Sequence, residues 1–329
     1  MLTRKQNMQE VVKGGAPDRF VKQYEALHIV MTDPYNLNDP YPEYGECNVV
    51  NSWGVTISWP LGTPGGFPVH DEKHIVCPDI TKWKDTVKAP KLIYPESAWE
   101  TAMKEVESID RNEFFIAPFI APGVFERVHY LMSIEEALVA FYLEPEKLHE
   151  LIKYITDWEL LYAEQLCKYL KPDALFHHDD WGSQTSTFVS PEMFEEFIYP
   201  SYKQIYGYYK SHGVEMIVHH SDSYAETLVP FMIDMGIDVW QGAMSTNNIK
   251  SILEKYGDKL TIMGGIDSAK VDHPGWTRQE IASEVRKACS TYGKLHYIPS
   301  ASQGLAISTF DGVYEALDEE IDNMSKEMF

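Results

Sequence analysis

"DALFHHDDWG", residues 173–182, joins a short apolar run to four consecutive titratable side chains. The same succession occurs again in "VEMIVHHSDS", residues 214–223. A short apolar run bounded by polar residues is consistent with a buried strand. Two strands that both finish in His-His followed by Asp are therefore the main chemical signal in this chain.

Strand and helix patterns alternate outward from these two segments. A strand is also expected near residues 18–27, and further strands are expected at 114–122, 238–243, 259–265 and 295–300, with amphipathic helical stretches between most of them. This order predicts a parallel sheet with right-handed crossovers. We interpret it as an α/β protein with a (β/α)8 TIM barrel in which one strand is not recognised, although periodicity alone does not separate a barrel from an open sheet.

Residues 32–90 interrupt this alternation. The segment is rich in Pro, Gly, Tyr and Trp, and "VVNSWGVTISW", residues 49–59, predicts a hairpin. We expect an N-terminal hairpin and loop insertion over one end of the barrel, within a single domain that spans residues 1–329.

Composition limits the classes of function. The chain of 329 residues carries 28 basic and 50 acidic side chains, a formal net charge of −22, which repels phosphate backbones and argues against nucleic acid as a partner. No run of 18 apolar residues occurs, and the start lacks the apolar core of a signal peptide, so we expect a soluble cytoplasmic protein with no membrane partner. Four widely separated cysteines predict neither a disulfide framework nor a cysteine-rich zinc site.

The polar strand ends supply the candidate catalytic residues, which are His178, Asp180, His220 and Asp222. In a barrel, the carboxyl ends of the strands line the active site. Because side chains alternate along a strand, we expect one His of each pair to face the interior and the other to face the helices. His and Asp suit a divalent metal or general acid–base chemistry, and His220 and Asp222 are candidate metal ligands. For each single residue the alternative is a hydrogen-bonded residue that fixes a loop.

Several common motifs are absent from the sequence. It contains no H-E-x-x-H, no G-x-x-x-x-G-K-[ST] and no G-x-G-x-x-G. The stretch "SQTS", residues 183–186, forms no nucleophile elbow, so a serine hydrolase has little support.

The chain resembles the uroporphyrinogen decarboxylase superfamily and, within it, the cobamide-dependent methyltransferase branch. The resemblance spans nearly the whole chain, and its most specific part is Asp-Asp-x-Gly-x-Gln followed by Ser-Pro-Glu-x-Phe. It is carried by "GGAPDRF" (14–20), "NSWGV" (51–55), "GVFERVHYLM" (123–132), "HHDDWGSQTSTFVSPEMFEEFIYPSYKQI" (177–205), "VHHSDS" (218–223) and "IMGGID" (262–267). The resemblance implies a (β/α)8 barrel.

The chain departs from the pattern of both branches: the first departure weakens the decarboxylase interpretation, and the second fits poorly with an enzyme that activates a thiol acceptor on zinc. The decarboxylases carry an Arg-rich N-terminal segment that grips the carboxylates of the substrate, and this chain has none. The methyltransferase branch often holds zinc through His-x-Cys and a later Cys, whereas this chain has His220-x-Asp222 and no Cys near residues 299–304. Zinc on a different ligand set, another metal arrangement and no metal all remain open.

The resemblance implies transfer of a methyl group from a small methylated compound, with an aromatic methyl ether as the leading candidate, to a corrinoid (cobalamin) on a separate protein. A phenolate leaves more readily when it is protonated or bound to a Lewis acid, which His220 with Asp222, or His178 with Asp180, could provide.

The alternatives are a decarboxylase-like lyase, which would act on a smaller substrate and bind it with cations such as Arg127, and a non-catalytic binding protein. Related barrels commonly form homodimers. Candidate substrate-binding residues are Asp179, Trp181, Gln184, Trp240 and Trp53.

Overall fold

The structure, a computed structural model, describes residues 1–63, 65–303 and 305–329. Its strands are β1 (Leu27–Val30), β2 (Val49–Val50), β3 (Thr56–Ser58), β4 (Phe67–Pro68), β5 (Phe115–Ile120), β6 (Ala174–His178), β7 (Met216–His220), β8 (Val239–Ala243), β9 (Thr261–Ile266) and β10 (Tyr297–Ala301). Seven of them form a parallel sheet in the order β1-β5-β6-β7-β8-β9-β10, and β2-β3-β4 form a small antiparallel sheet.

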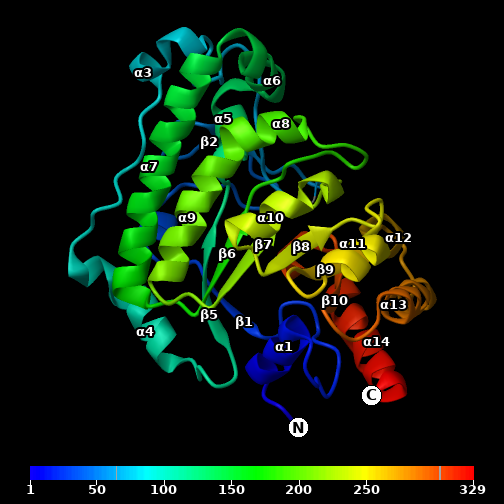
Figure 1. Ribbon diagram of the computed structural model, residues 1–329. Coiled ribbons are helices and arrows are strands. Elements are labelled where there is room, and N and C mark those ends of the chain that lie inside the picture. The colour runs from blue at the N-terminus through cyan, green and yellow to red at the C-terminus, as the bar shows by residue number, and fades with distance from the viewer. Residues whose placement is uncertain (64, 304) are drawn as a thin grey trace.

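Helices follow most strands and cover the outer face of the parallel sheet. They are α1 (Arg4–Lys13), α2 (Pro34–Asn38), α3 (Trp83–Thr86), α4 (Glu100–Ser108), α5 (Val124–Met132), α6 (Ile134–Leu143), α7 (Pro145–Leu170), α8 (Pro191–Met193), α9 (Tyr199–Ser211), α10 (Val229–Met235), α11 (Ile249–Tyr256), α12 (Ser268–Val271), α13 (Arg278–Tyr292) and α14 (Val313–Met328), with short 3-10 or π turns η1 (Ile80–Lys82), η2 (Glu96–Trp99), η3 (Phe194–Ile198), η4 (Glu226–Leu228) and η5 (Ala306–Ser308). Figure 1 shows α7 and α9 side by side along one flank, α13 and α14 on the other, and both chain ends at the lower end.

The parallel sheet curls into a TIM-type half-barrel. Within the described ranges it has seven strands, and no pairing joins β10 to β1, so an eighth strand is not seen there. In the place of such a pairing, helix α1 bridges the segments that lead into β10 and β5. The backbone N–H of His296 donates to the carbonyl of Val11 at 3.0 Å, and that of Lys5 donates to the carbonyl of Glu113 at 3.0 Å. Helix α1 was not expected from the sequence, although Thr3 and Gln6 form a capping box at its start.

The interior of the curled sheet is packed with side chains. An apolar cluster there includes Ala174 and Phe176 of β6 together with Met216 and Val218 of β7. Side chains on a strand point alternately to opposite faces, so the next inward positions fall on residues 178 and 220. The fold therefore brings one histidine of each pair to the end of the same interior.

The insertion contains the expected hairpin, because β2 pairs with β3 and β3 pairs with β4, all antiparallel. Another expectation shifts. The strand expected near residues 18–27 begins only at Leu27. In the described part of the chain, no helix combines the length and the apolar character that crossing a membrane requires.

Candidate functional site

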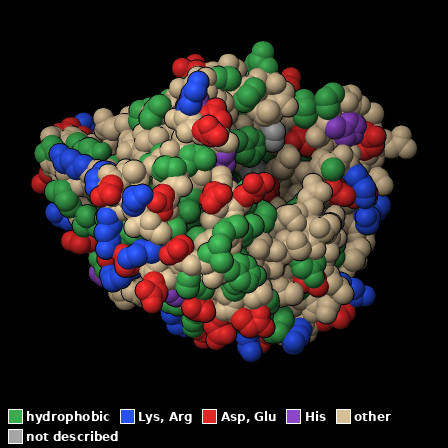
Figure 2. Space-filling view, turned by 90° about the horizontal axis from the view of Figure 1, so that it is seen from above, with side chains coloured by type: hydrophobic (Ala, Val, Ile, Leu, Met, Phe, Trp, Pro, Cys, Tyr) green, Lys and Arg blue, Asp and Glu red, His purple; other side chains and the backbone are tan. Residues whose placement is uncertain are grey.

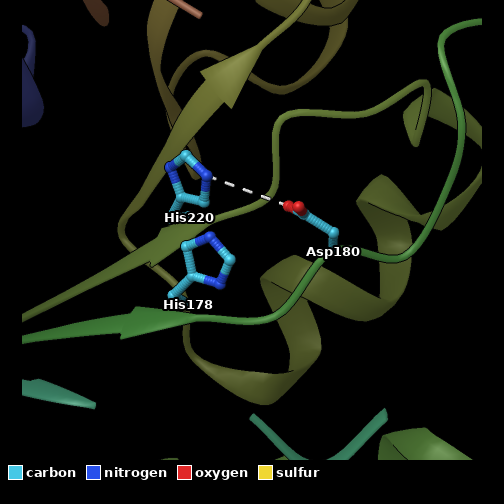
Figure 3. A group of neighbouring side chains, drawn as sticks. All are labelled: His178, Asp180 and His220. Carbon is cyan, nitrogen blue, oxygen red and sulfur yellow. Dashed lines mark ion pairs between the residues drawn. The ribbon is translucent and has the colours of Figure 1, made fainter. Parts of the chain in front are cut away.

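The inward histidines, His178 and His220, lie side by side at the ends of β6 and β7. Their positions are paired in the strand register, and their rings are nearly parallel, with centroids 4.3 Å apart and an interplanar angle of 14°. Asp180 approaches from the loop after β6, and its Oδ1 lies 3.8 Å from Nε2 of His220 (Figure 3). One ligand-type atom from each of these three side chains lies within 4.8 Å of the others.

Each inward ring is held through its Nδ1 atom. Nδ1 of His178 lies 2.8 Å from Oε2 of Glu126, a residue in the first turn of α5. Nδ1 of His220 is hydrogen-bonded to Oε1 of Gln241 on β8, the residue next to His220 in the strand register. Among the described residues, nothing is hydrogen-bonded to Nε2 of either ring. Neither Nε2 atom is therefore engaged by another described side chain or backbone group.

The charges of the two rings differ because their neighbours differ. Burial lowers the pKa of His178, but the carboxylates of Glu126 and Asp180 together outweigh it and raise the pKa to about 10. Burial and the adjacent His178 lower the pKa of His220 to about 4. Burial raises the pKa of Glu126 to about 7, although His178 opposes this. Near neutral pH the pair therefore consists of a charged His178 and a neutral His220, and a metal ion on Nε2 of His178 would have to displace the proton there.

Asp222 also belongs to this end of the barrel but not to the group of three. Its backbone N–H donates to Oδ1 of Asp180 at 2.9 Å. Burial, followed by the Asp180 carboxylate, raises the pKa of Asp222 well above its usual range. Its side chain can thus retain a proton at a pH where a free aspartate would have lost it.

The outward histidines face the helices and are completely buried. Nε2 of His177 lies 2.9 Å from Oε2 of Glu159 on α7, and both side chains have 0% exposure. Nδ1 of His219 lies 2.6 Å from the hydroxyl of Tyr206 on α9. The expectation that each pair splits between interior and helix layer is confirmed.

Asp179 fixes the start of α5. It is fully buried and accepts hydrogen bonds from the backbone N–H groups of Phe125 and Glu126 at 3.0 and 2.7 Å, from the indole N–H of Trp181 at 2.9 Å, and from the hydroxyl of Tyr202. Through these bonds Asp179 determines where Glu126 stands beside His178. Its predicted role in substrate binding is untested, but its oxygens are already engaged by the protein.

The other candidate substrate-binding residues are not gathered at the inward histidines. The ring of Trp181 stacks on His219 at 3.9 Å, and the indole N–H of Trp240 donates to the carbonyl of Ser221 at 3.0 Å, with both side chains buried. Trp53, also buried, packs against Trp158 of α7. Gln184 is exposed in the loop after β6. Their roles in substrate binding remain predictions.

Arg127 does not face the group of three as a free cation. Its guanidinium lies 4.7 Å from the ring centre of Trp53 and 4.9 Å from that of Trp158, and its Nη2 donates to the carbonyl of Pro122 at 2.7 Å. The side chain is buried and ties the insertion to α7.

The three clustered side chains fit a divalent metal ion. Two imidazoles and a carboxylate are a borderline-to-hard donor set of the kind that holds zinc or a similar ion with open coordination positions. The fit is supported by the Nδ1 partners, since a hydrogen bond at one ring nitrogen orients the other toward the metal. Of the two pairs expected from the sequence, His178 and Asp180 lie together with His220 in this group, and Asp222 stays outside it.

Sequence reasoning missed Glu126 and Gln241 as parts of the site. The signal for Gln241 was present, because the strand alternation that places His220 inward also places the only polar residue of "VWQGA" inward. The signal for Glu126 was weak, because it is one of two adjacent charged residues, Glu126 and Arg127, near the start of α5. Neither signal identifies the partner, which only the fold supplies.

The face of the molecule seen from above carries mixed charges. Figure 2, the view from above, shows acidic, basic and hydrophobic side chains interspersed, with no continuous basic patch among the coloured atoms. The larger of the two described cavities, about 540 Å³, lies beside α12 and α13, where Lys270, His273 and Glu280 are part of its lining, and neither His178 nor His220 lines it.

Comparison with known proteins identifies the family. A solved structure, a methyltransferase from Methanosarcina mazei, superposes with a TM-score of 0.67 over 98% of this chain and 99% of that chain, at 15% identity, which establishes a shared fold. No curated protein sequence matches the chain. The model of the family described as uroporphyrinogen decarboxylase (URO-D) matches residues 54–321, which is most of the chain. The chain therefore belongs to the uroporphyrinogen decarboxylase family.

Proposed function

We propose that this protein is a methyltransferase that moves a methyl group from a small methylated compound to the cobalt of a corrinoid on a separate protein. An aromatic methyl ether is the leading candidate donor. The family and the fold shared with a methyltransferase support the class of enzyme. The group of His178, Asp180 and His220 at the ends of β6 and β7 is the observation that carries the proposal.

The charges around this group favour methyl transfer over the alternative, a decarboxylase-like lyase. Glu126, Asp180 and Asp222 bring three carboxyl groups to the end of the barrel, and the cation among them is His178. Within this group a substrate with several carboxylates would meet one cation, His178, and several carboxyl groups, which is a poor complement to its charge. The one arginine considered for gripping a carboxylate, Arg127, is buried between two indoles.

The residues have separable tasks in the proposed reaction. His178, Asp180 and His220 would hold a divalent metal, which when bound supplies a Lewis acid for the oxygen that loses the methyl group. Glu126 orients His178, and Gln241 orients His220. Asp222 lies within the same end of the barrel as a buried acid that can deliver a proton to the leaving oxygen.

The test combines metal content with activity on the purified protein. We expect one divalent metal per chain, and methyl transfer to cob(I)alamin from at least one member of a panel of methoxylated aromatics. His220→Ala should lower the transfer rate by 100-fold or more, because it removes a candidate ligand, while the circular dichroism spectrum stays that of the wild type.

Three outcomes of this test would distinguish the proposal from its alternatives. Transfer without metal would assign the chemistry to proton donation by Asp222 or His178. Full transfer by His220→Ala would refute the role of this residue. Neither metal nor transfer, across aromatic and aliphatic donors, would favour the lyase.

A further inference from the structure

Gln241 is the only polar side chain of β8, and the strand places it in the barrel interior beside His220. It has no exposed surface, and its Oε1 is hydrogen-bonded to Nδ1 of His220. Its other polar atom, Nε2, is buried without a hydrogen-bond partner in the described structure. An unpartnered buried amide costs about 1–3 kcal/mol. Stability alone therefore does not account for a glutamine here.

The hydrogen bond determines which nitrogen of His220 carries the proton. An amide oxygen only accepts, so Nδ1 must be protonated and Nε2 must present its lone pair. In the opposite tautomer, Nε2–H would point toward Oδ1 of Asp180, which at 3.8 Å is too far to accept it. A nearly fully buried N–H would then lack an acceptor, so the Nδ1–H tautomer is favoured.

The backbone keeps Gln241 in this position. The ladder between β8 and β9 is irregular between Gln241 and Ala243, as in a β-bulge, and the intervening Gly242 has φ +87°. A Cβ on Gly242 would lie 3.0 Å from the backbone nitrogen of Asp222. The backbone N–H of Ser221 also donates to the carbonyl of Gln241 at 2.9 Å. The bulge thus packs β8 tightly against the loop that follows His220 and fixes the side chain beside the ring.

We propose that Gln241 is a positioning residue that holds His220 as the Nδ1–H tautomer, so that Nε2 faces Asp180 as a metal ligand. The inference rests on the proposed metal-binding role of His220 but not on the identity of the methyl donor. A hydrogen-bonding partner behind a ligand histidine fixes its orientation and basicity, and its loss weakens metal binding by about 10–100-fold.

The first measurement is the tautomer of His220 in the full chain. Nitrogen-15 NMR of protein labelled at histidine reports the protonated ring nitrogen, and comparison with His220→Gln assigns the signal. We expect Nδ1–H in the wild type and a mixture of tautomers in Gln241→Leu. A wild-type protein with the Nε2–H tautomer would overturn the proposal, and this result does not depend on methyl transfer or on bound metal.

The second measurement is the affinity for Zn²⁺ by competition with a chromophoric chelator. Gln241→Leu should bind Zn²⁺ 10–100-fold more weakly than the wild type, with a melting temperature within about 3 °C of it. Gln241→Glu, which keeps an oxygen acceptor, should restore the affinity to within a few-fold. The control is Gln165→Leu, a buried glutamine on α7, with unchanged affinity. Weakened folding with unchanged affinity in Gln241→Leu would show a structural role only and would refute the proposal.

Discussion

In each of the two His-His pairs, the two adjacent histidines lie in opposite environments. His177 and His219 are completely buried on the helix side, against Glu159 and the hydroxyl of Tyr206. His178 and His220 stand at the end of the barrel interior, where each ring is held at Nδ1 and its Nε2 is left to a ligand. Strand alternation thus divides a repeated dipeptide into an outward half (His177 and His219), which is buried against the helices, and an inward half (His178 and His220), which carries the proposed chemistry.

The outward half should therefore control stability. In Glu159→Ala, His177 loses its carboxylate partner in a site with no exposure, and we expect the free energy of unfolding to fall by about 3–5 kcal/mol. Urea denaturation measures this loss. Affinity for Zn²⁺, measured below the unfolding transition, should change less than threefold because the inward rings keep their partners.

Glu159→Gln is the matched control, since it keeps an oxygen acceptor for His177 and should lose less stability than Glu159→Ala. If Glu159→Ala were as stable as the wild type but had lost Zn²⁺, the division between the two halves would be wrong.

The sequence predicted this division only in part. The runs before His177 and His219 predicted both strands and their order, and period-two alternation predicted the split of each pair. Alternation could not say which histidine faces inward, because that depends on the register of the whole sheet around its core. Glu126 lies about fifty residues before His178 and reaches it only through the curl of β5 and β6, so no local pattern connects them. Asp180 rather than Asp222 completes the group because of loop geometry, which composition does not encode.

The inward half should control the pH dependence of stability. The pKa of His178 is raised from 6.5 to about 10, so the protonated ring stabilises the fold fully below pH 6.5, and this stabilisation is lost as the pH rises through 10. The metal-free wild type should therefore lose stability between pH 7 and pH 9.5. In Glu126→Gln, the nearest carboxylate is gone, the pKa of His178 falls, and that loss should shrink by about 2 kcal/mol.

Urea denaturation of both proteins at the two pH values measures the difference and cancels titrations elsewhere in the chain. The same loss in both proteins would mean that Glu126 does not govern the charge of His178. The inward histidines would then lose the electrostatic role proposed for them, whereas the structural role of the outward histidines would be unaffected.

The smallest expected effect is the sharpest check on the outward half. Tyr206→Phe removes one hydroxyl, which lies 2.6 Å from Nδ1 of His219, and leaves the ring packing of Tyr206 in place. Burial lowers the pKa of His219 well below its usual range, so the ring is neutral and the lost bond is one between neutral groups. We expect a fall of about 1 kcal/mol in the free energy of unfolding.

Zn²⁺ affinity should stay within twofold, because His219 and His220 share a backbone but no ligand atom. A tenfold loss of affinity at this small cost in stability would show that the outward ring positions the inward one through the strand, and the two halves would have to be treated as a single unit.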